Sequence, residues 1–111
     1  MKLLTLVAVL LALTVPLAAQ RVTTYEQLVV PNTVVGIAPA TLTGMALCSA
    51  RLEGGAIRWR LDGTNPTSTV GTPMRANDTL PIVNIFDAQA IRFIRSGGSN
   101  GTLNITCFPQ N

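Results

Sequence analysis

The stretch AIRWRL at residues 56–61 shows the pattern that decides the fold. Ile57, Trp59 and Leu61 are apolar, and an arginine follows each of the first two. Side chains two residues apart point to the same face of a β-strand, so this strand has one apolar and one charged face. Such alternation is typical of a strand that lies on a core with its other face in water. The stretch therefore predicts a half-buried strand in a β protein.

Further segments of the same kind lie on both sides of this strand. Thr102–Phe108 (TLNITCF) and Ala90–Arg95 (AIRFIR) alternate clearly, and turn-forming residues such as Asp62-Gly63 and Asn100-Gly101 separate the segments. Seven short strands spaced by turns indicate an all-β fold, a small antiparallel β-sandwich of immunoglobulin-like or jelly-roll-like type. The four weaker strands are predicted at Glu26–Val30, Thr33–Ile37, Met45–Leu52 and Leu80–Ile85.

The N-terminus has the layout of a secretory signal. Met1-Lys2 carries a positive charge, Leu3–Leu17 is almost wholly apolar, and small residues lead to Ala19. We expect a signal peptide at residues 1–19 and a single domain at residues 20–111, exported to the periplasm or medium. The apolar run is short for a membrane span, so no membrane association is expected after cleavage. An uncleaved anchor or a buried helix remains the alternative.

The chain has two cysteines, Cys48 and Cys107, each within a predicted strand. An even number of cysteines in an exported protein predicts a disulfide. Its closed loop of about sixty residues would stabilise the domain by about 4 kcal/mol in the chain-entropy treatment. Two separate buried thiols are the alternative interpretation.

Composition excludes several function classes. The 111 residues contain no His and only five acidic residues. Without His the chain lacks the commonest proton shuttle and metal ligand, and the scattered acids form no pair of the kind a glycosidase needs. We therefore expect neither an enzyme nor a bound metal or cofactor. The net charge of +3 is too small to indicate a nucleic-acid partner.

Three arginines form the first candidate binding site. Arg58 and Arg60 share the polar face of one predicted strand, and Arg92 lies on the polar face of another. If the strands pair, the three side chains form a row that could hold phosphate, sulfate or an acidic partner. A solvated sheet face is the simpler interpretation.

The loop after the strand at residues 56–61 is the second candidate binding site. Asp62 is suited to accept backbone hydrogen bonds in a turn, and Pro66 restricts Asn65 to an extended conformation. These residues explain a stiff turn by themselves, and the alternative is a small polar ligand bound by Asp62 and Asn65. Among the aromatic residues, Trp59 is expected to face the core, and Tyr25 and Phe86 to be exposed.

Short motifs of one kind are spread over most of the chain from Tyr25 to Phe108. They are Tyr25-Glu26-Gln27, Val34-Val35-Gly36, Ile57-Arg58-Trp59-Arg60, Asp62-Gly63-Thr64, Pro66-Thr67, Val70-Gly71, Ile91-Arg92-Phe93-Ile94 and Leu103-Asn104-Ile105. With these motifs the chain resembles a family of small bacteriophage proteins, encoded among virion genes and usually described as uncharacterised structural proteins. A looser similarity, over one hairpin, links Asp62-Gly63-Thr64 and Pro66-Thr67 to the immunoglobulin-like domain of chitobiases. The chain departs from the phage family at Leu61, where members usually carry an acid, and in its cysteine pair and signal.

This resemblance implies a non-enzymatic structural or accessory protein that packs on a repeating protein surface of a virion or tail. Small sandwiches of this kind often self-associate, so we also expect a homo-oligomer. Two alternatives stay open. One is a secreted module that binds glycan or a cell-surface polymer through the loops at residues 62–66 and 96–101. The other is a periplasmic inhibitor or immunity-type partner protein.

Overall fold

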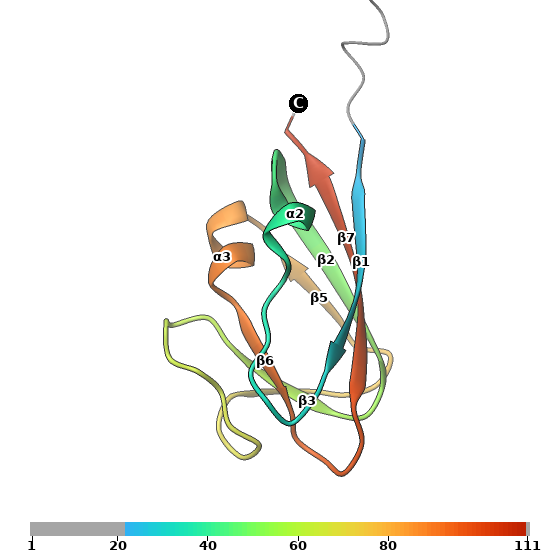
Figure 1. The fold of residues 1–111 in the computed structure, drawn as a ribbon, viewed down its shortest axis with the longest axis vertical. Helices are drawn as coiled ribbons and strands as arrows, with labels where there is room; N and C mark the ends of the chain where they lie inside the picture. The colour runs from blue at the N-terminus through green and yellow to red at the C-terminus, as the bar shows by residue number, and fades with distance from the viewer. Residues whose placement is uncertain (1–21, 111) are drawn as a thin grey trace, which may run out of the picture.

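The computed structural model describes residues 22–110, so the predicted signal peptide at residues 1–19 lies outside it. Seven strands and two short helices follow one another along the described chain (Figure 1). The strands are β1 (Thr24–Val30), β2 (Met45–Gly54), β3 (Ile57–Arg60), β4 (Thr72–Met74), β5 (Thr79–Ile82), β6 (Arg92–Arg95) and β7 (Gly101–Pro109), and the helices are α2 (Pro39–Leu42) and α3 (Ile85–Ala90).

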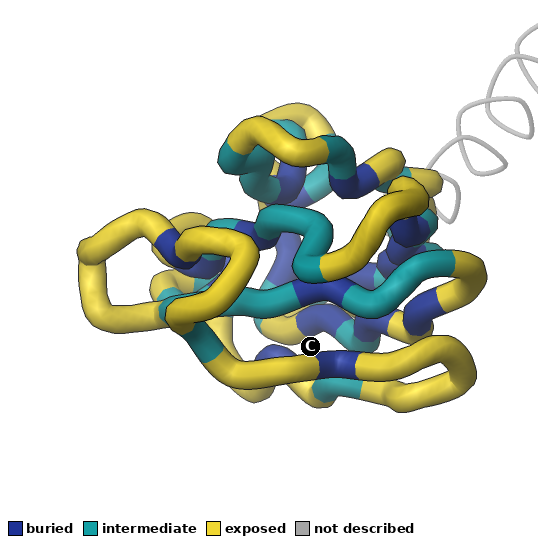
Figure 2. The backbone as a smooth tube through the Cα atoms, turned by 90° about the horizontal axis from the view of Figure 1, so that it is seen from below, coloured by how far each residue is buried: buried dark blue, intermediate teal, exposed yellow. Residues whose placement is uncertain are grey.

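The strands form two antiparallel sheets. A four-stranded sheet has the order β1-β7-β2-β5, and a three-stranded sheet has the order β4-β3-β6. The sheets share one hydrophobic core, and Figure 2 shows the buried backbone lying inside a rim of exposed loops. The structure confirms the predicted small antiparallel β-sandwich with seven strands.

Alternating burial along the strands builds this core. In β7, Leu103, Ile105 and Cys107 are buried while the polar residues between them are partly exposed. The three-stranded sheet contributes Phe93, which is fully buried, and Trp59 packs against the core as its alternation with arginine predicted. The buried apolar side chains are Val30, Ile37, Leu42, Met45, Cys48, Ala50, Leu52, Ile57, Met74, Ile82, Ala88, Ile91, Phe93, Leu103, Ile105 and Cys107.

The strand order differs from the constant-type immunoglobulin arrangement in one respect. In that arrangement the first, second, fourth and fifth strands form one sheet, and the third, sixth and seventh form the other. Here β4 and β7 have exchanged sheets. As a result β7 lies between β1 and β2 and pairs with both along nearly its full length.

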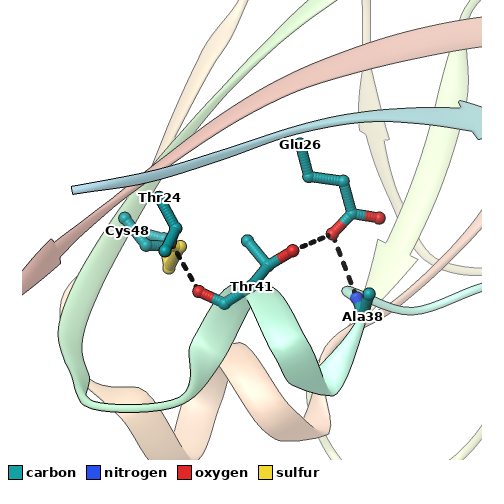
Figure 3. Close-up of a disulfide and its surroundings, with 6 residues drawn as sticks. Thr24, Glu26, Ala38, Thr41 and Cys48 are labelled. Carbon is teal, nitrogen blue, oxygen red and sulfur yellow. Dashed lines mark hydrogen bonds between the residues drawn. A yellow bond between two sulfur atoms is a disulfide. The ribbon is translucent and has the colours of Figure 1, made fainter. Parts of the chain in front are cut away.

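A disulfide joins the two central strands of the four-stranded sheet. Cys48 of β2 and Cys107 of β7 lie directly opposite each other, with their Cα atoms 4.0 Å apart and a sulfur–sulfur bond of 2.07 Å. Both residues are buried, and the bond lies close to α2 (Figure 3). The predicted disulfide is confirmed. It fixes the register of two neighbouring strands, whereas the immunoglobulin disulfide joins the two sheets.

A side chain holds the start of each of the two helices. The Asn84 side chain accepts the Asp87 backbone N–H at 2.8 Å and so caps the start of α3. At the start of α2, the Glu26 carboxylate of β1 accepts the Ala38 backbone N–H at 3.1 Å and the Thr41 hydroxyl at 2.9 Å (Figure 3). These bonds fasten α2 to the inner side of β1.

Several details of the sequence prediction differ from the structure. Residues 33–37 were expected to form a strand, but they make only an isolated bridge from Val35 to Phe93, because this segment crosses from one sheet to the other. The seventh strand is instead β4, whose three residues are too few to show alternation. Strand β3 ends at Arg60, so Leu61 is half-exposed at the start of the following loop rather than buried.

Candidate functional site

The structure brings the three candidate arginines to one face of the three-stranded sheet. Strands β3 and β6 pair so that Arg60 lies opposite Arg92, and Arg58 lies opposite Ile94. The buried Phe93 lies opposite Trp59 on the other face of the sheet, toward the core. The three arginines therefore form a row on the side that faces away from the core.

Each of these guanidinium groups is hydrogen-bonded within the chain. Arg58 donates to the backbone carbonyls of Ser68 at 3.2 Å and Gly71 at 2.8 Å, and so holds the loop between β3 and β4. Arg92 donates from one nitrogen to the carbonyls of Gln89 at 2.9 Å and Ile91 at 2.8 Å. Arg58 therefore acts first as a clamp on the following loop and Arg92 as a clamp on the end of α3, and each has only part of its donor fork left for a ligand.

Arg60 forms an ion pair with Asp62, two residues along the chain. The hydrogen bonds of this pair raise the pKa of Arg60, and together with the Thr64 backbone N–H they lower the pKa of Asp62 below its ordinary value. The Thr64 backbone N–H donates to Asp62 Oδ1 at 3.2 Å. This hydrogen bond forms part of the turn that the Asp62-Gly63 sequence predicted. Both partners reach solvent, so the pair shapes the turn more than it stabilises the fold.

The loop itself, residues 61–71, is fixed by Pro66 and Thr67 rather than by Asn65. Pro66 is fully buried, and the Thr67 hydroxyl accepts the backbone N–H groups of Thr69 and Val70. Asn65 is exposed, and within residues 22–110 its side chain has no hydrogen-bond partner. The structure does not join Asn65 and Asp62 in one hydrogen-bonded cluster.

A second surface, on the four-stranded sheet, was not singled out from the sequence. Its side chains point away from the core and both helices, and most are polar and uncharged. We call it the outer face. It consists of Tyr25, Gln27 and Val29 from β1, Thr102, Asn104, Thr106 and Phe108 from β7, Leu47, Ser49, Arg51 and Glu53 from β2, and Thr79 and Pro81 from β5.

The centre of the outer face contains a hydrogen-bonded cluster of side chains. Asn104 Oδ1 accepts the Tyr25 hydroxyl at 2.6 Å and the Gln27 amide at 3.2 Å. Tyr25 is 59% exposed, as the sequence predicted for this residue. The cluster brings an aromatic side chain and two side-chain amides together on this face, a combination that suits contact with another surface.

A cavity of about 500 Å³ lies between α2 and α3, beside the arginine row. Its walls include apolar Ile37, Leu42 and Ile85, with Gln89 and Arg92 as polar groups. This cavity could not be predicted from the sequence, because both helices that line it are too short to show a helical period. The Asn84–Asp87 cap was the one local signal that could have revealed α3.

The carboxylates of the described chain are dispersed over different elements. Glu26 is bonded to α2, Asp62 to Arg60, Asp78 to the Arg75 backbone, and Asp87 is paired with Asn84. Within residues 22–110 there is no cluster of three metal-ligating side chains. The same residues contain no helix long and apolar enough to cross a membrane.

Comparison with protein families, with characterised proteins and with solved structures finds no match to this chain.

Proposed function

We propose that this protein is a non-enzymatic structural or accessory protein that binds a protein surface through the outer face of its four-stranded sheet. The outer face is the observation that carries the proposal. It spans four paired strands, and charged side chains are confined to Arg51 and Glu53. Protein interfaces that are not permanent are typically polar at the rim, with aromatic side chains among their central contacts.

The arginine row is a weaker candidate for the binding surface. The carbonyls of the 67–71 loop and of α3 already take up donors of Arg58 and Arg92, and Asp62 neutralises Arg60. A ligand at this row would compete with bonds that hold the loops in place. Within residues 22–110, the side-chain hydrogen bonds of the outer face join Tyr25 and Gln27 to Asn104 and hold no loop in place. A partner can therefore bind this face without releasing a loop.

The surface we propose as the partner is that of a bacteriophage particle. The resemblance of residues 25–108 to small virion-associated phage proteins supports this assignment. The confirmed disulfide is compatible with export, since disulfides persist in oxidising compartments. We propose that the protein is exported and meets the particle outside the cytoplasm.

Mass spectrometry of a culture of the native host tests this proposal. Gradient-purified phage particles are compared with periplasm and spent medium, and copies of the protein are counted against a known particle protein. We expect the protein in the particles at a fixed copy number per particle. Recovery only as free protein beginning at Gln20 would contradict virion association.

A glycan-binding module is the second candidate, favoured by the exposed Tyr25 ring and the two amides beside it. Aromatic rings flanked by hydrogen-bonding groups stack on sugar rings. This candidate predicts saturable retention on insoluble polysaccharide that falls when Tyr25 is replaced by Ala. Equal retention of the Tyr25→Ala variant and the unchanged protein would contradict it.

A further inference from the structure

The four sheet edges of the described chain are protected unequally. Open edges expose unpaired backbone groups, and proteins usually block them with proline or a covering segment. Strand β4 has three residues with Pro73 at its centre, and β5 has four residues with Pro81. The edge of β6 is bridged by Val35 through two hydrogen bonds. Strand β1 has seven residues, no proline and no bridging segment.

The register identifies which β1 residues have backbone groups at the open edge. Leu52 of β2 bonds through its N–H and C=O to Asp78 and Asn77, so its backbone points away from β7. Leu103 of β7 lies opposite Leu52, so its backbone N–H and C=O groups also point away from β2, toward β1. On β1, the residue opposite Leu103 is Leu28.

Because this direction alternates along a strand, the N–H and C=O groups of Tyr25, Gln27 and Val29 point to the open side of β1. Within the described chain no residue hydrogen-bonds to these six backbone groups. All three residues are exposed. Helix α2 contacts β1 through the inward-facing side chains of Thr24 and Glu26, so it leaves this set uncovered.

We propose that the open edge of β1 pairs with the same edge of a second copy, antiparallel and with a two-fold axis at Gln27. This places Gln27 opposite Gln27 and Tyr25 opposite Val29, and all six outward backbone groups of each strand are satisfied. The two four-stranded sheets then become one continuous sheet of eight strands, and the two outer faces become one surface.

The sequence of β1 is compatible with itself in this register. Tyr25 and Val29 form an aromatic and β-branched pair on the outer face, a favourable cross-strand combination. The one charged residue of β1, Glu26, lies opposite Leu28 and not opposite its own copy. No pair of like charges therefore faces across the two-fold axis. This inference does not depend on which surface the outer face binds.

Charge-swap variants test the register. Sedimentation velocity is measured on the protein purified from the producing cell, at concentrations from about 1 µM to 1 mM. This range is needed because a seven-residue edge gives a small interface and so a weak dimer. We expect the unchanged protein to dimerise with rising concentration. Gln27→Lys and Gln27→Glu each place like charges on the axis and should weaken the dimer at least about tenfold. An equimolar mixture of the two variants should restore dimerisation as a heterodimer.

Amide hydrogen exchange supplies a second readout that does not need variants. Pairing predicts that the amides of Tyr25, Gln27 and Val29 exchange more slowly as concentration rises, while those of Glu26 and Leu28 stay protected at every concentration.

Thr64→Lys, on the exposed loop, is the matched control for the Gln27 variants and should dimerise as the unchanged protein does. A monomer at the highest concentration, or a variant mixture that associates no better than either variant alone, would overturn the proposal.

Discussion

Different interactions hold the strands together within each of the two sheets. The four-stranded sheet has long strands, β2 and β7, joined by a continuous ladder and by the Cys48–Cys107 disulfide. The three-stranded sheet has strands of three or four residues, and side chains such as Arg58 fasten its loops. The first sheet is therefore fixed by long backbone ladders and a covalent bond, and the second by short backbone ladders with side-chain hydrogen bonds to its loops. A rigid sheet with a free outer face suits binding, and a sheet whose side chains hold loops suits support.

Removing the disulfide, which only the four-stranded sheet contains, should cause the largest loss of stability. We expect Cys48→Ala with Cys107→Ala to lower the free energy of unfolding by about 4 kcal/mol, because the bond closes a long loop. Urea denaturation followed by circular dichroism measures the loss. A change below about 1 kcal/mol would mean that the strand ladder alone fixes the four-stranded sheet.

A methyl group at the junction of the two sheets should have an intermediate effect. A Cβ at Gly101 would lie 2.6 Å from the Gly55 carbonyl and 2.8 Å from side-chain atoms of Ile57 and Leu52. We expect Gly101→Ala to cost about 2 kcal/mol through overpacking. Gly97→Ala is the matched control, because a Cβ there meets no atom within 4 Å. Equal stability of the two variants would show that the junction is not tightly packed.

Loss of the Arg58 clamp should have a smaller and more local effect. Arg58→Ala removes the hydrogen bonds to Ser68 and Gly71, and we expect a loss of about 1 kcal/mol. The Val70 amide should exchange faster, while amides of β7 should not change. Arg58→Lys keeps the charge without the planar fork and should recover only part of the protection. Faster amide exchange in β7 would show that loss of the Arg58 hydrogen bonds also loosens the four-stranded sheet.

The Arg60–Asp62 pair should have the smallest effect. The pKa of Asp62 is lowered in the folded protein, so its contribution to stability is present above the ordinary carboxyl value of 3.8 and is lost as the pH falls through the folded pKa. Asp62→Asn should therefore lower the melting temperature slightly at pH 7 and not at all at a pH below the folded pKa. A loss that persists at low pH would point to the turn rather than the charge.

The long strands and the disulfide could be predicted from the sequence because their signals extend over many residues. Residues 102–108 alternate in a single pattern that only a half-buried strand explains, and parity indicated the bond between Cys48 and Cys107. The short elements could not be predicted in the same way. Strand β4 has three residues around Pro73, and α3 forms only where Asn84 caps it.

The candidate sites were predictable only in part, because side chains compete for partners once the chain folds. Alternation correctly placed Arg58, Arg60 and Arg92 on one face, given the pairing of β3 and β6. It did not reveal that backbone carbonyls of the following loop and of α3, together with Asp62, would engage their guanidinium groups. The outer face was missed because its polar residues come from four strands whose order a sequence does not display.

A pair of matched threonine variants tests the central claim, that the outer face is the binding surface. Thr106→Lys places a charge at the middle of the outer face, and Thr64→Lys places the same charge on the exposed loop of the other sheet. Each variant replaces the native protein in the producing host, and its copy number per purified particle is counted. We predict that Thr106→Lys is largely lost from the particles while Thr64→Lys remains at the native copy number. Equal copy numbers for the two variants, or absence of the native protein from the particles, would contradict the account.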